Sequence, residues 1–126
     1  MAGEQILVVE DNEKNMKLLR DVLESAGYRT VEATTGGRAV ELAAERRPDL
    51  VLMDVQLPDL NGVEALGRLR ADERTASIPV LAVTAQAMQG DRERFLAAGF
   101  DGYVSKPVNI VELLGTVKQQ CEGRGR

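Results

Sequence analysis

The sequence predicts an α/β fold: a doubly wound parallel sheet of five strands, covered by helices on both faces as a three-layer sandwich. Two observations indicate it. Five short, mostly apolar runs alternate with segments in which apolar residues recur at steps of three and four, as expected for buried strands that each lead into an amphipathic helix. The second run, at 28–33, is more polar than the others, which suits an edge strand. With that strand at an edge, the natural order is 2-1-3-4-5, the flavodoxin-like arrangement.

The expected strands cover residues 5–9, 28–33, 50–53, 79–83 and 101–105. The helix after the first strand is capped by Asn12 and stopped by Gly27. The next helix is capped by Thr34 or Thr35 and cannot continue through Pro48. Three further helices are expected from about 62, around 88–98 and from 110 onward, and the one around 88–98 has the weakest amphipathic pattern.

Length and composition indicate one domain, residues 1–126, with an ordered core at about 4–121 and a short disordered C-terminal tail. The formal net charge is -4 and no basic cluster is present, which argues against a nucleic-acid surface. No apolar stretch approaches the roughly 20 residues of a membrane-spanning helix, and the N-terminus lacks the apolar core of a signal peptide. We therefore expect a cytoplasmic protein that binds neither nucleic acid nor membranes.

The absence of histidine removes several kinds of site at once. A catalytic Ser-His-Asp triad, a histidine-ligated zinc and a histidine general base are all excluded. The single cysteine, Cys121, cannot complete a thiolate metal site and falls at helical spacing after Val117, so we interpret it as a helix-face residue. Any metal must then be held by oxygen, which favours a hard cation such as Mg²⁺.

Four of the five strands end on a charged or reactive side chain. These residues are Glu10 and Asp11, Asp54, Thr84, and Lys106. Each alone has a simpler interpretation as a helix cap or a surface charge, but the carboxyl ends of parallel strands meet at the edge where α/β sheets bind ligands. Clustered carboxylates repel one another unless a cation neutralises them, which predicts Mg²⁺. Asp54 could then act as a nucleophile toward a phosphoryl group, while Lys106 balances its charge and the Thr84 hydroxyl donates to one of its oxygens.

This set of motifs resembles the receiver domain of two-component response regulators over essentially the whole chain. The motifs are Val9-Glu10-Asp11-Asn12 with Asn15-Met16, Asp54 after Leu52-Met53, Thr84-Ala85 and Lys106-Pro107. Within the family they are most similar to stand-alone single-domain regulators and to the receivers of hybrid kinases. The resemblance implies that Asp54 is the phosphoacceptor. It also implies that Mg²⁺ is bound by Asp11, Asp54 and the backbone carbonyl of Gln56, with Glu10 assisting through water.

The resemblance assigns further roles beside the metal site. Thr84, Ala85 and Lys106 would contact the phosphoryl group, and the aromatic ring of Tyr103 would turn inward as part of the switch. An aromatic residue in a short strand is also compatible with plain packing. The family further implies a cis peptide bond between Lys106 and Pro107. It places tuning of dephosphorylation on the residues two past Asp54 and Thr84, here Gln56 and Gln86.

The function implied is a phosphorylation-dependent signalling switch that catalyses its own phosphoryl transfer and autodephosphorylation and is not otherwise an enzyme. Its phosphodonor would be a sensor histidine kinase or a histidine phosphotransfer protein. Its target would be a protein bound through the fourth helix, fifth strand and fifth helix. We expect a monomer or weak dimer, with no output domain after the last helix.

Three alternatives are weighed against this function. A metabolite phosphatase of the haloacid dehalogenase type would carry a second aspartate where Gln56 stands. A flavin-binding module would need a Ser/Thr/Gly-rich phosphate loop after the first strand, where Glu10 and Asp11 would instead repel a phosphate. A receiver-fold scaffold that works without phosphorylation would not need the acidic, threonine and lysine positions to be intact.

Overall fold

The computed structural model describes residues 3–85 and 91–124, and it confirms the predicted fold class and strand order. Its sheet has the order β2-β1-β3-β4-β5, and all neighbouring strands are parallel. The strands are β1 (Gln5–Val9), β2 (Arg29–Ala33), β3 (Leu50–Asp54), β4 (Val80–Thr84) and β5 (Gly102–Ser105). The helices are α1 (Glu13–Ser25), α2 (Gly36–Arg46), α3 (Gly62–Ala71), α4 (Asp91–Ala98) and α5 (Ile110–Arg124).

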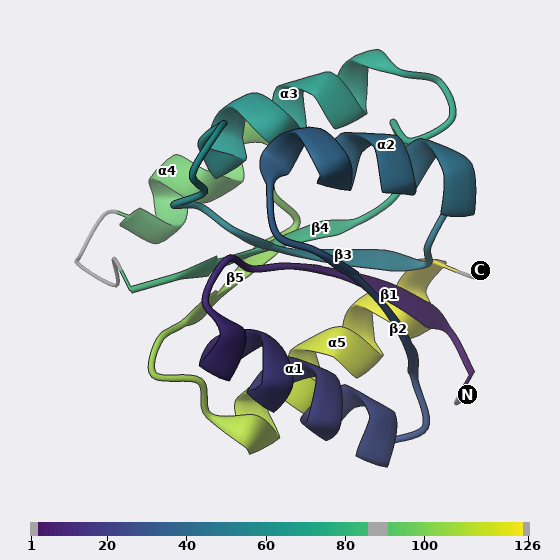
Figure 1. The fold of residues 1–126 in the computed structure, drawn as a ribbon, viewed down its shortest axis with the longest axis vertical. Coiled ribbons are helices and arrows are strands. Elements are labelled where there is room, and N and C mark those ends of the chain that lie inside the picture. The colour runs from purple at the N-terminus through teal and green to yellow at the C-terminus, as the bar shows by residue number, and fades with distance from the viewer. Residues whose placement is uncertain (1–2, 86–90, 125–126) are drawn as a thin grey trace.

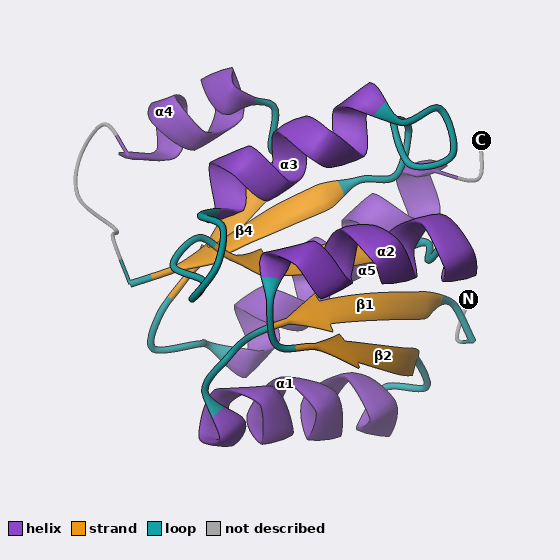
Figure 2. Cartoon of the chain, turned by 45° about the horizontal axis from the view of Figure 1, so that its top comes forward, coloured by secondary structure: helices purple, strands orange, loops and turns teal. Residues whose placement is uncertain are grey.

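The sheet forms the middle of three layers. Helices α2, α3 and α4 lie on one face of it, and α1 and α5 lie on the other (Figures 1 and 2). Because side chains alternate between the faces of a strand, β1 sends Leu7 into the apolar cluster under α2, α3 and α4, and Ile6 into the cluster over α1 and α5. The central strands β3 and β4 are buried along their whole length. Their carboxyl ends are thereby fixed next to each other.

Polar side chains start the first three helices. The Asn12 side chain accepts hydrogen bonds from the first turn of α1, and the Asn61 side chain does the same for α3. Of the two threonines expected to cap α2, the cap is Thr35, whose hydroxyl accepts from the Arg38 N–H at 3.1 Å. These caps place the helix starts directly after the strand ends, on the side of the sheet where the predicted site residues lie.

Several element boundaries differ from the sequence-based expectation, and those of β3, β4 and β5 differ by one residue. Strand β2 begins at Arg29 because the Tyr28 N–H donates to the Leu23 carbonyl at 3.1 Å and so belongs to the turn after α1. Helix α5 continues to Arg124, past the position near 121 where the ordered core was expected to end. Helix α4 begins at Asp91, and the expected start at Met88 lies outside the described residues.

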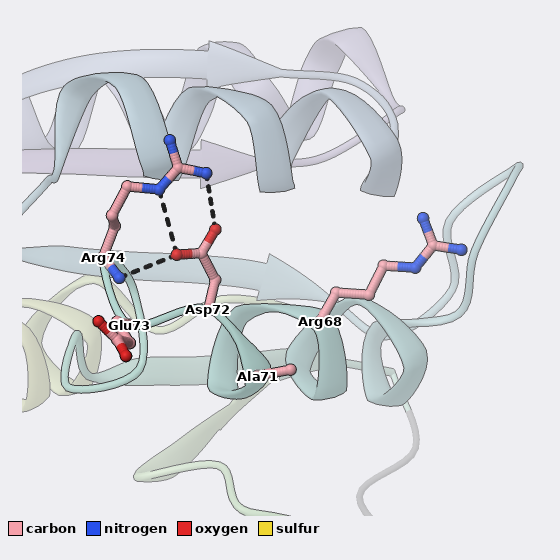
Figure 3. A pocket seen from close by; sticks show the side chains of 5 residues that line it. All are labelled: Arg68, Ala71, Asp72, Glu73 and Arg74. Atoms are coloured by element: carbon pink, nitrogen blue, oxygen red, sulfur yellow. Dashed lines mark hydrogen bonds and ion pairs between the residues drawn. The ribbon is translucent and has the colours of Figure 1, made fainter.

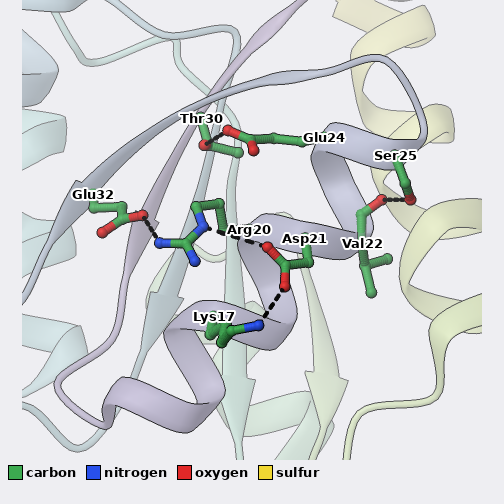
Figure 4. A network of polar contacts seen from close by, with 8 residues as sticks. All are labelled: Lys17, Arg20, Asp21, Val22, Glu24, Ser25, Thr30 and Glu32. Carbon is green, nitrogen blue, oxygen red and sulfur yellow. Dashed lines mark hydrogen bonds and ion pairs between the residues drawn. The ribbon is translucent and has the colours of Figure 1, made fainter.

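The polar character of β2 follows from its edge position. Thr30 donates to Glu24 at 2.8 Å, and Glu32 accepts from Arg20 at 3.0 Å, so these two side chains of β2 bind side chains of α1 (Figure 4), while Arg29 donates to the Gly3 carbonyl at 2.8 Å. On α1 itself, Lys17 donates to Asp21 at 3.2 Å. The strand can therefore carry polar residues without leaving them unpaired against the helix.

The single cysteine, Cys121, is buried in the apolar cluster between the sheet and helices α1 and α5, as its helical spacing predicted. Among the residues that the structure describes, none of the helices combines the length and the apolar character needed to cross a membrane.

Candidate functional site

Three predicted carboxylates come together at the carboxyl edge of the sheet. Glu10 and Asp11 follow β1, and Asp54 is the last residue of the neighbouring strand β3. One oxygen of each lies within 4.8 Å of the others. Glu10 and Asp54 are only 1% and 5% exposed, whereas Asp11 faces solvent. The site is therefore an acidic cluster with two buried members and one exposed member.

Lys106 lies between the two buried carboxylates. Its Nζ donates to Asp54 Oδ2 at 3.0 Å and lies 3.0 Å from Glu10 Oε1. The contact with Glu10 is an ion pair, and Oε1 is a buried oxygen without a hydrogen-bond partner. The lysine thus supplies the compensating charge that two buried carboxylates need.

Burial and the contacts between charged side chains together determine the pKa values of Glu10 and Lys106. Burial raises the pKa of Glu10 above its ordinary value, and the contact with Lys106 and the N–H of Asn12 only partly oppose it. Burial acts to lower the pKa of Lys106, but its bonds to Glu10 and Asp54 outweigh that effect and hold the pKa above its ordinary value. Lys106 is therefore protonated and positively charged beside the two buried carboxylates.

The backbone after β3 fixes the direction of the Asp54 carboxylate. Asp54 Oδ1 accepts from the Gln56 N–H at 2.9 Å, and the Gly62 N–H donates to the Val55 carbonyl at 2.9 Å. A Cβ at Gly62 would lie 2.8 Å from Val55 Cα and 3.0 Å from the Asp54 carbonyl oxygen. Only glycine allows α3 to start this close to the strand, so Gly62 has a packing role.

The predicted switch residues lie on the next two strands. Thr84 ends β4 with 1% exposure, Ala85 follows it on the surface, and the Lys106 N–H donates to the Thr84 carbonyl at 2.7 Å. The Lys106–Pro107 bond is cis. Tyr103, on β5, is half-buried against the α2–α3–α4 cluster, with its ring 6.4 Å from that of Phe95.

Of the two residues predicted to tune dephosphorylation, the structure describes one. Gln56 is exposed at the start of the loop after Asp54. Gln86 lies outside the described residues. Sequence reasoning assigned no role to Asp59, yet its carboxylate binds the first turn of α2, and the Gly36-Gly37 pair at that helix start was the available signal.

The donor atoms fit a hard divalent cation. They are oxygens from clustered carboxylates, and one of them, Glu10 Oε1, is buried without a hydrogen bond. The described side chains near them offer neither imidazole nor thiolate, which a softer metal would prefer. The residues present are thus suited to Mg²⁺.

The sheet is flavodoxin-like, and its carboxyl edge carries three clustered carboxylates and a lysine. This combination defines a class of protein: an α/β domain with an oxygen-only cation site around a buried aspartate. The comparison with known proteins gives the family. The chain belongs to the response regulator receiver domain family, whose profile matches residues 6–118. This confirms the resemblance seen in the sequence.

Individual relatives agree with this family. The polar-differentiation response regulators DivK of Brucella anthropi and Brucella ovis are each 48% identical over 113 residues, covering 90% of this chain and 92% of theirs. The receiver domain of sensor histidine kinase PA1611 from Pseudomonas aeruginosa, solved with a magnesium ion coordinated in its active site cleft, is 40% identical. It superposes with a TM-score of 0.88 over 96% of this chain and 99% of that one. Chemotaxis response regulator CheY4 of Vibrio cholerae is 26% identical with a TM-score of 0.88, over 94% and 99% of the two chains.

Family membership sets the general role. Receiver domains are signalling switches, and their partners are histidine kinases or histidine phosphotransfer proteins.

Proposed function

We propose that this receiver takes a phosphoryl group from a phosphohistidine of its partner onto Asp54, with Mg²⁺, and that the modification switches its protein–protein interactions. The observation that carries the proposal is the position of Lys106, whose Nζ lies 3.0 Å from both Glu10 and Asp54 in a site whose donors are all oxygen. Such a site holds a carboxylate nucleophile next to a fixed cation.

The transfer of the phosphoryl group requires little covalent chemistry from the protein beyond the Asp54 carboxylate. An oxygen of the Asp54 carboxylate forms a bond to phosphorus while the bond from phosphorus to the imidazole nitrogen breaks, and that nitrogen keeps the electron pair. Lys106 is placed to balance charge on the transferring oxygens, and the Thr84 hydroxyl and the Ala85 backbone lie on the adjacent strand end to bind them. The same site would catalyse the hydrolysis that returns Asp54 to its free form.

The cation would be held by Asp11, Asp54 and the backbone carbonyl of Gln56, with Glu10 assisting through water. When bound, Mg²⁺ would supply positive charge that neutralises the carboxylates and the incoming phosphoryl oxygens. Asp11 is the exposed carboxylate of the cluster, so it is the one that a hydrated ion from solvent can reach first.

The downstream surface is proposed to be the face formed by α4, β5 and α5. A groove of about 470 Å³ lies there, lined by residues of these elements that include Leu96, Tyr103 and Glu112. Tyr103 belongs both to this groove and to the core cluster, so a change in its position would alter the surface that a target protein meets. Phosphorylation would act by favouring the arrangement to which the target binds better.

Several finer assignments belong to the same proposal. Gln56 and Gln86 would set how long the phosphoryl group persists. The protein would act as a monomer or weak dimer in the cytoplasm, since its one cysteine, Cys121, cannot form a disulfide within the chain.

Intact-mass measurement tests this function. The protein is incubated with Mg²⁺ and acetyl phosphate, with and without EDTA, in parallel with the Asp54→Asn variant and with Asp72→Asn as a control for loss of a half-buried carboxylate outside the acidic cluster. We expect an acid-labile phosphoryl adduct that requires Mg²⁺, forms on the native protein and on Asp72→Asn, and is absent from Asp54→Asn. Equal adduct on Asp54→Asn would place the modification elsewhere. No adduct at all, with partner binding unchanged by Asp54→Asn, would favour the phosphorylation-independent scaffold.

A further inference from the structure

The loop between Asp54 and α3 is held at its middle by a side chain, as well as at its two ends. Asp59 Oδ1 accepts from the Gly36 N–H at 2.7 Å, and Oδ2 accepts from the Gly37 N–H at 2.9 Å. These are the first two N–H groups of α2, 22 and 23 residues earlier in the chain. One carboxylate therefore ties the loop of the phosphoacceptor to the start of another helix.

The helix start is shaped for this contact. The capping residue of α2, Thr35, reaches the Arg38 N–H, which leaves the two preceding N–H groups for Asp59. A Cβ at Gly36 would lie 3.0 Å from Leu60 Cβ, and one at Gly37 would lie 3.2 Å from Asp59 Oδ2. The glycine pair thus provides both the donors and the space for the loop. The bonds also hold the pKa of Asp59 below its ordinary value, with the Gly37 N–H as the main cause.

The contact between Asp59 and α2 joins segments on either side of β1, the strand that leads into Glu10 and Asp11. Helix α2 follows the edge strand β2, and β1 lies between β2 and β3. A bond from the loop after β3 to the start of α2 therefore spans the width of β1, which leads into Glu10 and Asp11. It fixes the loop relative to that strand end, in addition to the sheet hydrogen bonds.

The loop also contains a group whose position matters for the cation. Gln56 donates its N–H to Asp54 Oδ1, and its carbonyl is the one backbone ligand in the proposed Mg²⁺ site. The loop base is closed by the Gly62 N–H on the Val55 carbonyl. Between base and tip, the bond of Asp59 to α2 limits how far the backbone of Gln56 can turn.

We propose that Asp59 is a positioning residue for cation binding: by fastening the loop to the N-terminus of α2, it holds the Gln56 carbonyl in place against Asp54 and Asp11. This inference rests on the Mg²⁺ site of the proposed function. A ligand held in its bound position before the cation arrives does not have to be ordered by the cation, so the affinity is higher. Residues that orient direct metal ligands typically change metal affinity by about 10- to 100-fold, and Asp59 acts through backbone, so we expect roughly three- to tenfold.

The test combines calorimetry of Mg²⁺ binding with hydrogen exchange of the Gly36 and Gly37 amides. The variants are Asp59→Asn and, as a control with the same change of charge, Asp72→Asn. Asp72 lies at the C-terminal end of α3 and pairs with Arg74 at 2.8 Å (Figure 3). In the metal-free native protein the two amides should be protected, and Asp59→Asn should lower the protection of at least one of them, because asparagine has one acceptor oxygen in place of two.

We expect Asp59→Asn to raise the dissociation constant for Mg²⁺ about three- to tenfold while Asp72→Asn leaves it nearly unchanged. Coupling between two sites is reciprocal, so saturating Mg²⁺ should slow exchange of the Gly37 amide in the native protein by a similar factor. A long-range effect of charge would not produce that slowing. An unchanged affinity in Asp59→Asn, or Gly37 exchange that does not respond to Mg²⁺, would overturn the role of Asp59. A native protein that binds no Mg²⁺ would instead overturn the proposed cation site itself.

Discussion

Replacing Lys106 with methionine tests how the acidic site is stabilised before any cation binds. The substitution keeps the length of the side chain but removes the positive charge 3.0 Å from both Glu10 and Asp54. Removing one partner of a buried ion pair usually costs about 3–5 kcal/mol, because the remaining charge is left uncompensated. The Lys106 side chain is 20% exposed, so we expect the free energy of unfolding to fall by about 3 kcal/mol, the lower end of that range.

The loss should depend on pH in a defined direction. Burial already raises the pKa of Glu10, and Lys106 opposes that rise, so the variant should have a still higher pKa at Glu10. A folded protein with a raised carboxyl pKa binds the proton more tightly than the unfolded chain does. Its stability therefore increases as pH falls through the raised pKa toward the ordinary value of 4.5. The difference in free energy of unfolding between the native protein and Lys106→Met should therefore become smaller as the pH is lowered from 7.5 to 5.

Urea denaturation followed by circular dichroism, in EDTA, measures both effects. The control is Lys17→Met, which breaks the pair with Asp21 at 3.2 Å on the exposed face of α1, where the two side chains are 70% and 53% exposed. That change should leave the free energy of unfolding nearly unchanged, because solvent screens an exposed pair. Adding Mg²⁺ should restore part of the stability of Lys106→Met, because the cation binds the folded state and supplies the missing charge. Equal losses in the two variants, or a deficit in Lys106→Met that does not change with pH, would refute the reasoning.

Two further predictions concern other parts of the chain. Gly62→Ala should lower the free energy of unfolding by at least about 2 kcal/mol, because the added Cβ would lie 2.8 Å from the backbone. Gly67→Ala, in the interior of α3 with open space around it, should raise the free energy of unfolding by about 0.5–1 kcal/mol. Urea denaturation measures both changes, and a mild effect of Gly62→Ala would contradict the close approach of α3 to the strand. The side chain and backbone N–H of Arg74 lower the pKa of Asp72 to about 2, so their stabilising effect is present above the ordinary value of 3.8 and is lost as pH falls through about 2 (Figure 3). Arg74→Gln should move that pKa toward 3.8 in an NMR titration of the carboxyl carbon, and an unchanged value would show that the ion pair is not formed in solution.

The sheet and the convergence of the acidic residues could be predicted because they depend on patterns along the chain. Apolar runs of strand length identify the strands, and a parallel sheet brings Asp54 to the same edge as Glu10 without any knowledge of side-chain positions. The edge position of β2 followed from its polar residues in the same way.

What could not be predicted depends on distances across the fold. The sequence does not reveal that Lys106 reaches two carboxylates at once or that Glu10 is almost completely buried, since both follow from how the loop after β5 packs on the end of β1. The role of Asp59 could not be seen in the sequence because its hydrogen-bond partners lie at the start of another helix, α2. Tyr28 fits a strand by composition, but its N–H is used by the turn after α1.

The charges of the site indicate an order for the proposed reaction. Glu10, Asp11 and Asp54 bring three negative charges and Lys106 one positive charge, so the site as it stands repels an anionic phosphodonor. Binding of a divalent cation would bring this group close to neutrality, and only then would the approach of a phosphoryl group cost little. Lys106 cannot replace the cation in that step, because its charge is already used to stabilise two buried carboxylates in the resting protein. In the proposed reaction, the oxygens of a phosphoryl group on Asp54 would become the stronger partner for Lys106, and the lysine would leave Glu10. The position of Lys106 would then link phosphorylation to the loop after β5, which lies beside the proposed target surface.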